Sequence, residues 1–345
     1  MKTLIVRPVV AITLGDPAGV GPEICADCLM DKGIYDKVRP VLIGNKEIIA
    51  KALELKKCKF PIHIIEQPSQ GIYQYGTIDL IQADCDISGS EIEYGKLSID
   101  AAKMARSFII KGIELAKQGL IDVISTSPIN KESFGMAGFV EKDHTALFKK
   151  YYGDVATTSM FHCLELKVFH YTRHMSLKNA IEFLDIDKIV KSIKEINITL
   201  KNLGIEKPVI AVAALNPHAS DNGMFGDEEE KFLIPAIEKC REEGLIVEGP
   251  VPADAVFYLQ RKGNYNAILT LYHDQGHIAC KTYDFDKSVS LTFGLPFMRT
   301  TVDHGTAYDI AGKGIASHQN LKEAVLIGAE YWKLQRETEE LHEKL

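Results

Sequence analysis

The sequence predicts an α/β protein of two domains, with helices on both faces of largely parallel sheets. Three observations support this fold class. The chain has 345 residues, which is long for one hydrophobic core and suits two. Short β-rich runs alternate with longer helical patterns. Most of the short runs are apolar on both faces, as strands of a buried parallel sheet are.

The expected strands are short and follow one another at intervals filled by helical patterns. They are residues 9–14, 40–43, 62–65, 123–125, 168–171, 209–213 and 267–271, and residues 288–296 form a further strand and turn. The expected helices are residues 22–30, 46–55, 98–118, 186–203, 227–243 and 319–336. The longest, 98–118, carries its apolar residues on one stripe, which predicts one buried face.

A domain change is expected near residues 128–138 and again near 284–288. The middle segment, 131–284, then forms one α/β/α domain, and the two ends, 1–130 and 285–345, form the other. A cleft between the two domains is part of this prediction.

Composition and charge exclude several classes of protein. Apolar residues make up 46% and charged residues 25%, as in ordinary globular proteins. A net charge of −7 argues against a nucleic-acid partner. No apolar run approaches the length of a membrane span, and residues 1–10 lack the features of a signal peptide. Seven cysteines without a paired framework indicate a reducing compartment, so we expect a cytoplasmic protein.

Two glycine-rich segments each follow an expected strand. Residues 304–316 contain three glycines, which allow a ligand to approach the backbone, but the segment lacks both common nucleotide-binding signatures. Residues 15–23 contain three glycines and two prolines. This second segment fits a ligand-binding loop at the carboxyl end of a strand, and it fits a stiff connection equally well.

The histidines offer candidate metal ligands. His174, His218 and His273 each lie just after an expected strand. Three imidazoles with an open position form a catalytic divalent-metal site, although a single histidine in such a place is usually structural. His277 and His304 rank lower. The remaining histidines have no comparable context; they are His63, His162, His170, His318 and His342.

Other residues suit an anionic ligand. His144 and Thr145 precede an apolar run, so they fit a phosphate site at a helix N-terminus or a plain helix cap. Lys281 and Arg299 lie in apolar surroundings, where an anion is a natural partner and surface placement is the alternative. Residues 125–131, with hydroxyls, an amide and a lysine, fit a ligand site or a capped turn.

Taken together, these segments resemble the 4-hydroxythreonine-4-phosphate dehydrogenase family of pyridoxal phosphate biosynthesis. The matching residues are 12–23, 127–131, 216–219, 252–254, 272–276 and 294–314. The last segment is also similar to the cofactor loop of isocitrate and 3-isopropylmalate dehydrogenases, whose fold the family shares. The resemblance implies that fold, a divalent metal, NAD or NADP as cofactor, and a homodimer with a shared active site.

The resemblance also implies roles for single residues. The metal ligands would be His174, His218 and His273, with His273 supplied by the neighbouring subunit. The substrate would be held by His144, Thr145, Lys281, Ser290 and Arg299. The NAD loop would include His304, Gly305, Thr306, Ala307 and Asp309.

Some positions depart from the family pattern. Asp143 and Ala146 replace a glycine and a glutamate, and Ser290 stands where an asparagine contact is expected. His277-Ile278 is similar to a catabolic branch that acts on phosphorylated four-carbon sugar acids. The substrate is therefore less well defined than the reaction type.

The resulting hypothesis is a metal-dependent oxidation and decarboxylation of a phosphorylated hydroxy acid bound across the interdomain cleft. The first candidate substrate is 4-phosphohydroxy-L-threonine, and the alternatives are D-threonate and D-erythronate 4-phosphate. Candidate bases are Asp254, Asp274 and Lys281. Three histidines suit Zn, Co, Ni or Mn, while the family implies Mg as well. A phosphate acyltransferase-like transferase and an inactive metabolite-binding protein are the rivals from other classes.

Overall fold

The computed structural model describes residues 7–153 and 155–343, so residues 1–6 of the N-terminal segment considered above lie outside it. The chain divides into two compact units. Unit 1 comprises residues 1–156 and 294–333, and unit 2 comprises residues 157–293 and 334–345. The sequence placed these boundaries at 130 and 284 instead.

Helix and strand packing explains the shifted boundaries. Helices α5 (Lys131–Met136) and α6 (His144–Tyr152) pack on α4 (Ile99–Lys117), so residues 131–156 belong to unit 1. Strand β11 (Ser288–Phe293) pairs with β6 (Thr158–Cys163), so it belongs to unit 2. These contacts are between residues far apart in the sequence, which explains why local composition did not reveal them.

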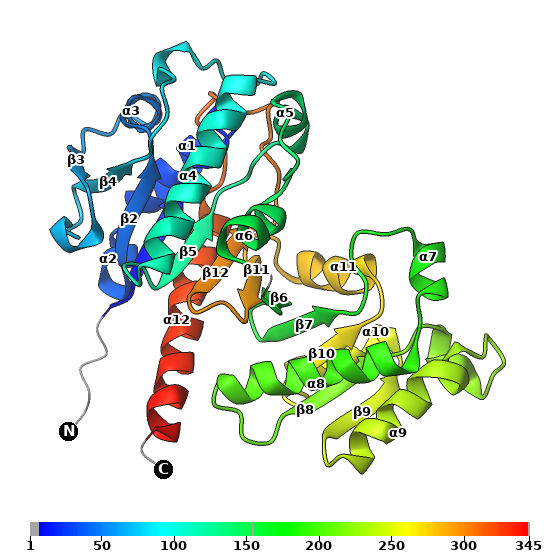
Figure 1. The fold of residues 1–345 in the computed structure, drawn as a ribbon. Coiled ribbons are helices and arrows are strands. Elements are labelled where there is room, and N and C mark those ends of the chain that lie inside the picture. Colours follow the sequence, from blue (N-terminus) through cyan, green and yellow to red (C-terminus); the bar gives the residue numbers. More distant parts are fainter. Residues whose placement is uncertain (1–6, 154, 344–345) are drawn as a thin grey trace. The chain divides into compact units, whose positions relative to one another are not determined.

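The described residues of unit 1 form six parallel strands in the order β3-β4-β2-β1-β5-β12 (Figure 1). Their bounds are β1 Val9–Thr13, β2 Arg39–Gly44, β3 Ile62–Ile65, β4 Ile78–Gln82, β5 Val123–Thr126 and β12 Met298–Val302. Strands β1, β2 and β5 are almost wholly buried along their length, as predicted for parallel strands covered on both sides.

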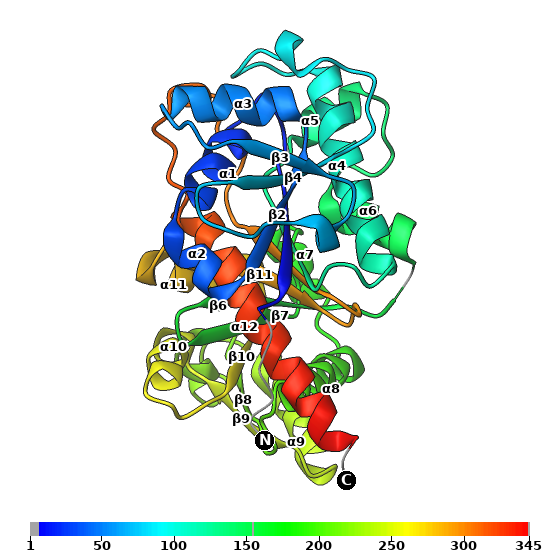
Figure 2. The ribbon, with the colours of Figure 1, turned by 90° about the vertical axis from the view of Figure 1, so that its left-hand side faces the viewer.

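Helices cover both faces of the unit 1 sheet, and Figure 2 shows α1 and α4 on opposite sides of it. The other helices are α1 Gly21–Leu29, α2 Lys32–Lys37, α3 Lys46–Leu55 and α12 Gln319–His342, whose last part belongs to unit 2. Gly112 of α4 lies over Ile124, whereas Gly328 of α12 lies over Val123. Since neighbouring strand residues point to opposite faces, the two helices pack on opposite sides of β5.

Unit 2 contains a mixed sheet in the order β11-β6-β7-β10-β8-β9. Strand β6 is antiparallel to both neighbours, and the other pairs are parallel. The bounds are β7 Leu166–His170, β8 Val209–Ala213, β9 Ile246–Val251 and β10 Ala267–Thr270. The sequence did not predict β6 or β9, so its expectation of largely parallel strands is corrected for this edge of the sheet.

The unit 2 helices are α7 Leu177–Glu182, α8 Ile186–Asn202, α9 Ile234–Glu242, α10 Ala253–Arg261 and α11 His273–Tyr283. Cys280 of α11 packs on Phe161 and Val168, and Val256 of α10 packs on Ala211 and Ile268. Shorter helical turns are Pro68–Gln70, Gly89–Glu91, Pro217–Asp221 and the π turn Glu229–Leu233. Within the described residues, no helix has the length and hydropathy to cross a membrane.

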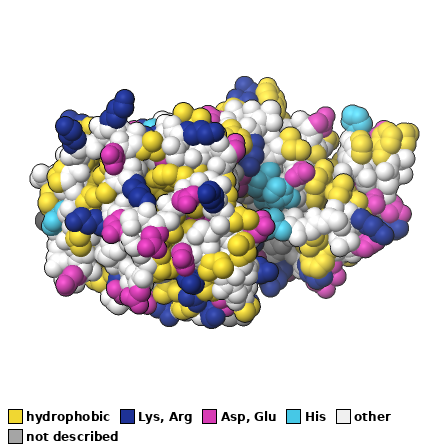
Figure 3. Space-filling view, turned by 90° about the horizontal axis from the view of Figure 1, so that it is seen from above, with side chains coloured by type: hydrophobic (Ala, Val, Ile, Leu, Met, Phe, Trp, Pro, Cys, Tyr) yellow, Lys and Arg dark blue, Asp and Glu magenta, His cyan; other side chains and the backbone are white. Residues whose placement is uncertain are grey.

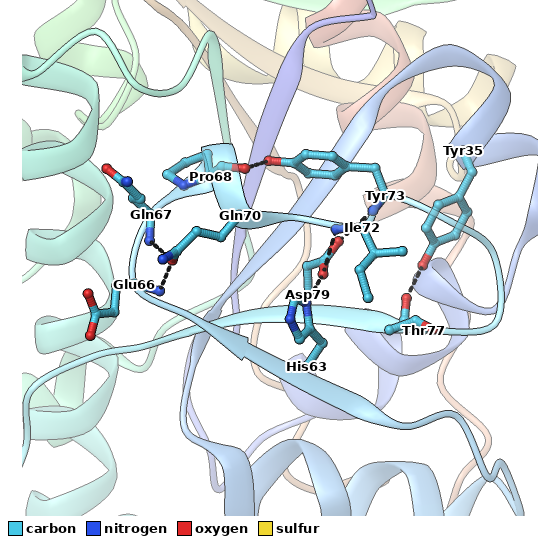
Figure 4. Close-up of polar contacts among 10 residues, drawn as sticks. All are labelled: Tyr35, His63, Glu66, Gln67, Pro68, Gln70, Ile72, Tyr73, Thr77 and Asp79. Carbon is cyan, nitrogen blue, oxygen red and sulfur yellow. Dashed lines mark hydrogen bonds and ion pairs between the residues drawn. The ribbon is translucent and has the colours of Figure 1, made fainter.

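A buried carboxylate organises the β3–β4 edge of unit 1 (Figure 4). Asp79 is 3% exposed. Its oxygens accept hydrogen bonds from the backbone N–H groups of Ile72 and Tyr73, at 3.1 and 2.7 Å. Nδ1 of His63 lies 2.8 Å from the same carboxylate, on the neighbouring strand. The buried charge is thus matched by donors of its own unit.

Candidate active site

A half-buried histidine whose Nε2 atom is buried lies at the start of α6 in unit 1. Asp143 caps this helix through the backbone N–H of Ala146, at 2.9 Å, and His144 is the first helical residue. Nε2 of His144 is buried and makes no hydrogen bond within residues 7–153 and 155–343. Burial, reinforced by the charges of Arg299 and Lys131, lowers the pKa of His144 to about 3. The ring is therefore neutral, with one polar atom available to a ligand.

Arg299 brings a buried positive charge to the same place. It lies on β12 and is 6% exposed. Its guanidinium lies over the ring of Phe148 on α6, 4.9 Å from the centroid, and Nη1 donates to Oγ1 of Thr145 at 3.5 Å. The structure thus brings together three predicted substrate residues, His144, Thr145 and Arg299. A cation and a helix N-terminus together suit a phosphate group.

The segment 15–23 holds the predicted cofactor loop in place. The N–H of Val20 donates to the carbonyl of Thr306 at 3.0 Å, and the Tyr308 hydroxyl donates to Asp16 at 2.6 Å. Gly19 is needed for this approach, because a Cβ there would lie 2.8 Å from Cβ of Thr306. Burial raises the pKa of Asp16, and the hydrogen bonds from Tyr308 and Ala18 oppose that rise.

Glu23 fixes the second half of the loop. Its fully buried carboxylate accepts the backbone N–H groups of Gly312 and of Gly314, the latter at 2.9 Å. Nζ of Lys56 donates to the carbonyl of Gly314 at 2.9 Å. Nothing in the sequence singled out Glu23 or Tyr308 for this part.

The predicted NAD residues differ in exposure. Thr306 is buried, whereas Gly305 and Asp309 are exposed, and a Cβ on Gly305 would meet no other atom within 4 Å. Nδ1 of His304 lies 3.0 Å from the carbonyl oxygen of Gly305, and its buried Nε2 has no hydrogen bond in the described part of the chain. A loop whose backbone is held by buried hydrogen bonds on one side and exposed to solvent on the other fits a dinucleotide-binding loop.

Two of the predicted metal ligands line one pocket of unit 2. His174 follows β7, His273 begins α11, and their ring centroids are 5.8 Å apart. The pocket holds about 550 Å³ and is lined by Arg173, His174, Met175, Ser176, Leu177, Tyr272, His273 and Asp274. Oδ1 of Asp274 lies 2.7 Å from Nδ1 of His273, which leaves Nε2 as the donor atom for a metal.

His218 occupies an unusual turn after β8. Residues 218–222 all have positive φ, between 46° and 71°, which makes a left-handed turn without glycine. Glu229, 2% exposed, accepts the backbone N–H groups of Leu215 and Asn216 at 2.8 and 2.7 Å and so holds the chain before the turn. Such strain is concentrated at functional sites.

The described part of a single chain does not assemble the predicted ligand set. His218 does not line the pocket of His174 and His273, and no three His, Cys, Asp or Glu side chains lie close enough to hold a metal ion. The donor chemistry fits a divalent transition metal, because His174 and His273 are imidazoles and a carboxylate orients one of them. The supply of His273 by a second subunit stays a prediction.

Two further histidines adjoin His273, and the sequence had ranked both low. Nδ1 of His277 lies 3.1 Å from Nε2 of His170, and the ring of His277 stacks on that of His273. Burial, followed by the nearby His277 and His273, lowers the pKa of His170 well below its usual value. Figure 3 shows histidine side chains gathered on one part of the surface. No local pattern marks these two residues, because packing of α11 on β7 brings them together.

Three other predicted residues do not line the pocket of His174 and His273. Lys281 is on α11, with Nζ 5.2 Å from the ring centroid of Phe285. Asp254 is exposed in the first turn of α10. Ser290 lies on β11 directly opposite Phe161.

Residues 36–328 match the family model of pyridoxal phosphate biosynthetic protein PdxA. The chain belongs to the PdxA family. The motif resemblance and the fold class predicted from the sequence are thereby confirmed. A relative from Symbiobacterium thermophilum named "Putative D-threonate 4-phosphate dehydrogenase" is 43% identical, over 94% of this chain and 97% of its own length.

Solved structures of the PdxA family agree with the fold. A 4-hydroxythreonine-4-phosphate dehydrogenase from Klebsiella pneumoniae is 33% identical with a TM-score of 0.87, covering 96% of this chain and 99% of that one. The enzyme of the same name from Burkholderia phymatum is 38% identical with a TM-score of 0.81, covering 94% and 98%.

Proposed function

We propose that the protein is an NAD-dependent and divalent-metal-dependent dehydrogenase that oxidises and decarboxylates a phosphorylated hydroxy acid. The first candidate substrate is 4-phosphohydroxy-L-threonine, with D-threonate or D-erythronate 4-phosphate as the alternative. PdxA family membership supports the reaction class. NADP is the alternative cofactor, and zinc is one of the candidate metals, with Co, Mn and Mg. These two points and the proposed cytoplasmic location rest on the sequence.

The observation that carries the proposal is the buried Nε2 of His144 next to the buried side chain of Arg299. The neutral imidazole of His144 has a buried nitrogen, Nε2, that makes no hydrogen bond within the described residues. It lies beside the guanidinium of Arg299, which packs over the ring of Phe148. Buried polar atoms are nearly always satisfied, so this nitrogen requires a ligand. A terminal phosphate matches it, since its oxygens accept from His144, Thr145, Arg299 and the first N–H groups of α6.

The histidines of unit 2 supply the metal ligands of the proposal. His174 and His218 would bind the metal in one subunit, with His273 from a second copy of the chain, which makes the homodimer part of the proposal. A bound divalent metal lowers the pKa of a coordinated hydroxyl and stabilises the negative charge left by decarboxylation. Asp274 holds Nδ1 of His273 and so selects the nitrogen that faces the metal.

The proton acceptor belongs to the remaining candidates. Because one oxygen of Asp274 is engaged with His273, we assign Asp274 the orienting role and leave Lys281 and Asp254 to accept the proton of the substrate hydroxyl. Lys281 follows His273 by eight residues on α11, which is two steps of the i, i+4 spacing that places side chains on one side of a helix. Ser290 offers one donor and one acceptor to the substrate.

When bound, NAD would supply the hydride acceptor, and that chemistry is the cofactor's own. The chain's contribution is the loop of His304, Gly305, Thr306, Ala307 and Asp309. Asp16 and Glu23 hold this loop from behind, so its backbone is fixed before NAD binds. A preorganised loop binds its ligand with a smaller loss of conformational entropy.

The test is the formation of NADH by the purified protein with Co²⁺, Zn²⁺ or Mg²⁺ in turn. The substrates to compare are 4-phosphohydroxy-L-threonine, D-threonate 4-phosphate and D-erythronate 4-phosphate, with the unphosphorylated acids as controls. We expect metal-dependent turnover of one phosphorylated acid and at least about tenfold lower kcat/KM without the phosphate. Equal turnover with and without phosphate would contradict the proposal.

A further inference from the structure

Three rings form a continuous stack in unit 2. The ring of Phe161, on β6, stacks on His277 with centroids 4.1 Å apart and planes at 21°. The ring of His277 stacks on His273 with centroids 3.8 Å apart and planes at 10°. His273 and His277 are four residues apart on α11, so they lie one above the other on one helix face. The plane of His273 is therefore set by a column that begins in the sheet.

The middle ring of this stack is itself fixed by hydrogen bonds. Nδ1 of His277 lies 3.1 Å from the backbone oxygen of His273 and 3.1 Å from Nε2 of His170. A carbonyl oxygen only accepts, so Nδ1 of His277 carries the hydrogen. Nε2 of His170 then accepts from the same hydrogen. His277 is thereby oriented about its side-chain bonds, as well as stacked.

The close contact between α11 and β7 depends on Gly276. A Cβ at this position would lie 2.5 Å from Nε2 of His170 and 2.8 Å from Cγ1 of Val168. Cys280, one turn after His277, is fully buried in the cluster of Phe161 and Val168. The helix is thus seated directly on the sheet, and the ring column has little freedom to tilt.

We propose that His277 is a positioning residue that fixes the plane of His273 for metal binding, through ring stacking on one side and its bond to His170 on the other. The inference rests on the proposed function, in which His273 is a metal ligand. Asp274 sets which nitrogen of His273 faces the metal, whereas His277 sets the direction in which that nitrogen points. Because the His273 side chain is already held in the orientation that metal binding requires, it would lose less conformational entropy when a metal binds.

The experiment titrates Co²⁺ alone into chelator-treated full-length protein and follows the visible cobalt absorption. His277→Leu fills similar space but removes the planar ring and its nitrogens, and His277→Phe keeps a ring that stacks. His162→Leu is the matched control, because it removes a buried imidazole from β6. His162 is next to Phe161 in the sequence, but its side chain points to the opposite face of the sheet.

We expect His277→Leu to bind Co²⁺ about 10- to 100-fold more weakly with a changed absorption band, as losses of supporting residues around metal ligands do. His277→Phe should keep most of the affinity, and His162→Leu should bind as the wild type does. Wild-type Co²⁺ affinity in His277→Leu, in a protein whose His273→Ala variant has lost Co²⁺, would overturn the inference alone. Wild-type affinity in His273→Ala would overturn the ligand assignment of the proposed function.

Discussion

Asp79 and Nε2 of His144 are both buried in unit 1, but their hydrogen bonding differs. Both oxygens of Asp79 accept hydrogen bonds from Ile72, Tyr73 and His63 (Figure 4). His144 keeps a buried nitrogen that makes no described hydrogen bond, and Arg299 lies beside it. A buried group satisfied by its own fold stabilises that fold, whereas one left with an open atom indicates a ligand.

Loss of a proposed metal ligand should give the largest functional effect in this comparison. His218→Ala removes an imidazole held by a turn that Glu229 already supports, so the fold should remain. We expect loss of bound metal and at least about a hundredfold fall in kcat, since supporting residues alone cost that much. Metal content and kcat are the measurements, with circular dichroism as the control for folding. Wild-type metal content would refute the assignment.

Arg299→Met tests the anion site next to His144. Charge-assisted hydrogen bonds contribute about 1.5–3 kcal/mol, so KM for the phosphorylated substrate should rise about 10- to 100-fold. The unfolding midpoint should change little, because Met still packs on Phe148. Arg336→Met, at an exposed position of α12, is the control and should leave KM unchanged. An unchanged KM in Arg299→Met would count against the phosphate role.

Asp79→Asn tests the structural side of the comparison. The amide keeps the shape of the carboxylate. Its NH₂ group, however, only donates hydrogen bonds, so it cannot accept the N–H donors that one carboxylate oxygen of Asp79 accepts. The free energy of unfolding should fall by about 1–2 kcal/mol, measured by urea denaturation, while kcat/KM stays at the wild-type value. A loss of activity without a loss of stability would place this edge in the active site and break the comparison.

Glu23→Gln separates the cofactor loop from the substrate site. The amide oxygen still accepts one of the two glycine N–H groups, so about 1 kcal/mol is lost. We expect about a fivefold weaker Kd for NAD, measured by calorimetry, with the metal affinity unchanged. Glu339→Gln, exposed on α12, serves as control. Equal weakening of NAD and metal binding would indicate general destabilisation instead.

His144 also gives a pH dependence of stability, the smallest of these effects. Its pKa is about 3 in the folded protein, below the ordinary value of 6.5, so the unfolded chain binds the proton first. Stability is therefore lost as pH falls below about 6.5. Relative to His144→Gln, the wild type should lose about 0.7 kcal/mol between pH 7 and pH 6. A difference that stays constant over this range would contradict a neutral buried ring.

The elements that the sequence predicts well are those whose pattern is local. The strands Ile62–Ile65 and Val209–Ala213 and the helix Lys46–Leu55 match their predicted bounds. Helix α11 was missed, because His273–Tyr283 is largely polar and forms a helix by packing Cys280 and His277 on the sheet. Strand β9 was missed because it contains Gly249-Pro250 at the edge of its sheet.

The candidate site shows the same division. His174 and His273 could be proposed because each follows a recognisable strand, and the structure places them at one pocket. His170 and His277 could not, since their positions depend on register and helix seating that no local pattern encodes. Glu23 was visible only as part of a glycine-rich segment, and its partners lie 289 and 291 residues further on.

The left-handed turn at residues 218–222 has a consequence for the order of folding. Each residue with a Cβ in this conformation costs about 1–2 kcal/mol, less for Asp and Asn, so the isolated segment does not adopt it. We expect the turn to form after the π turn containing Glu229 has docked and its carboxylate holds Leu215 and Asn216. His218 should thus be among the last side chains to reach its native position, and the proposed metal site would be completed after the core.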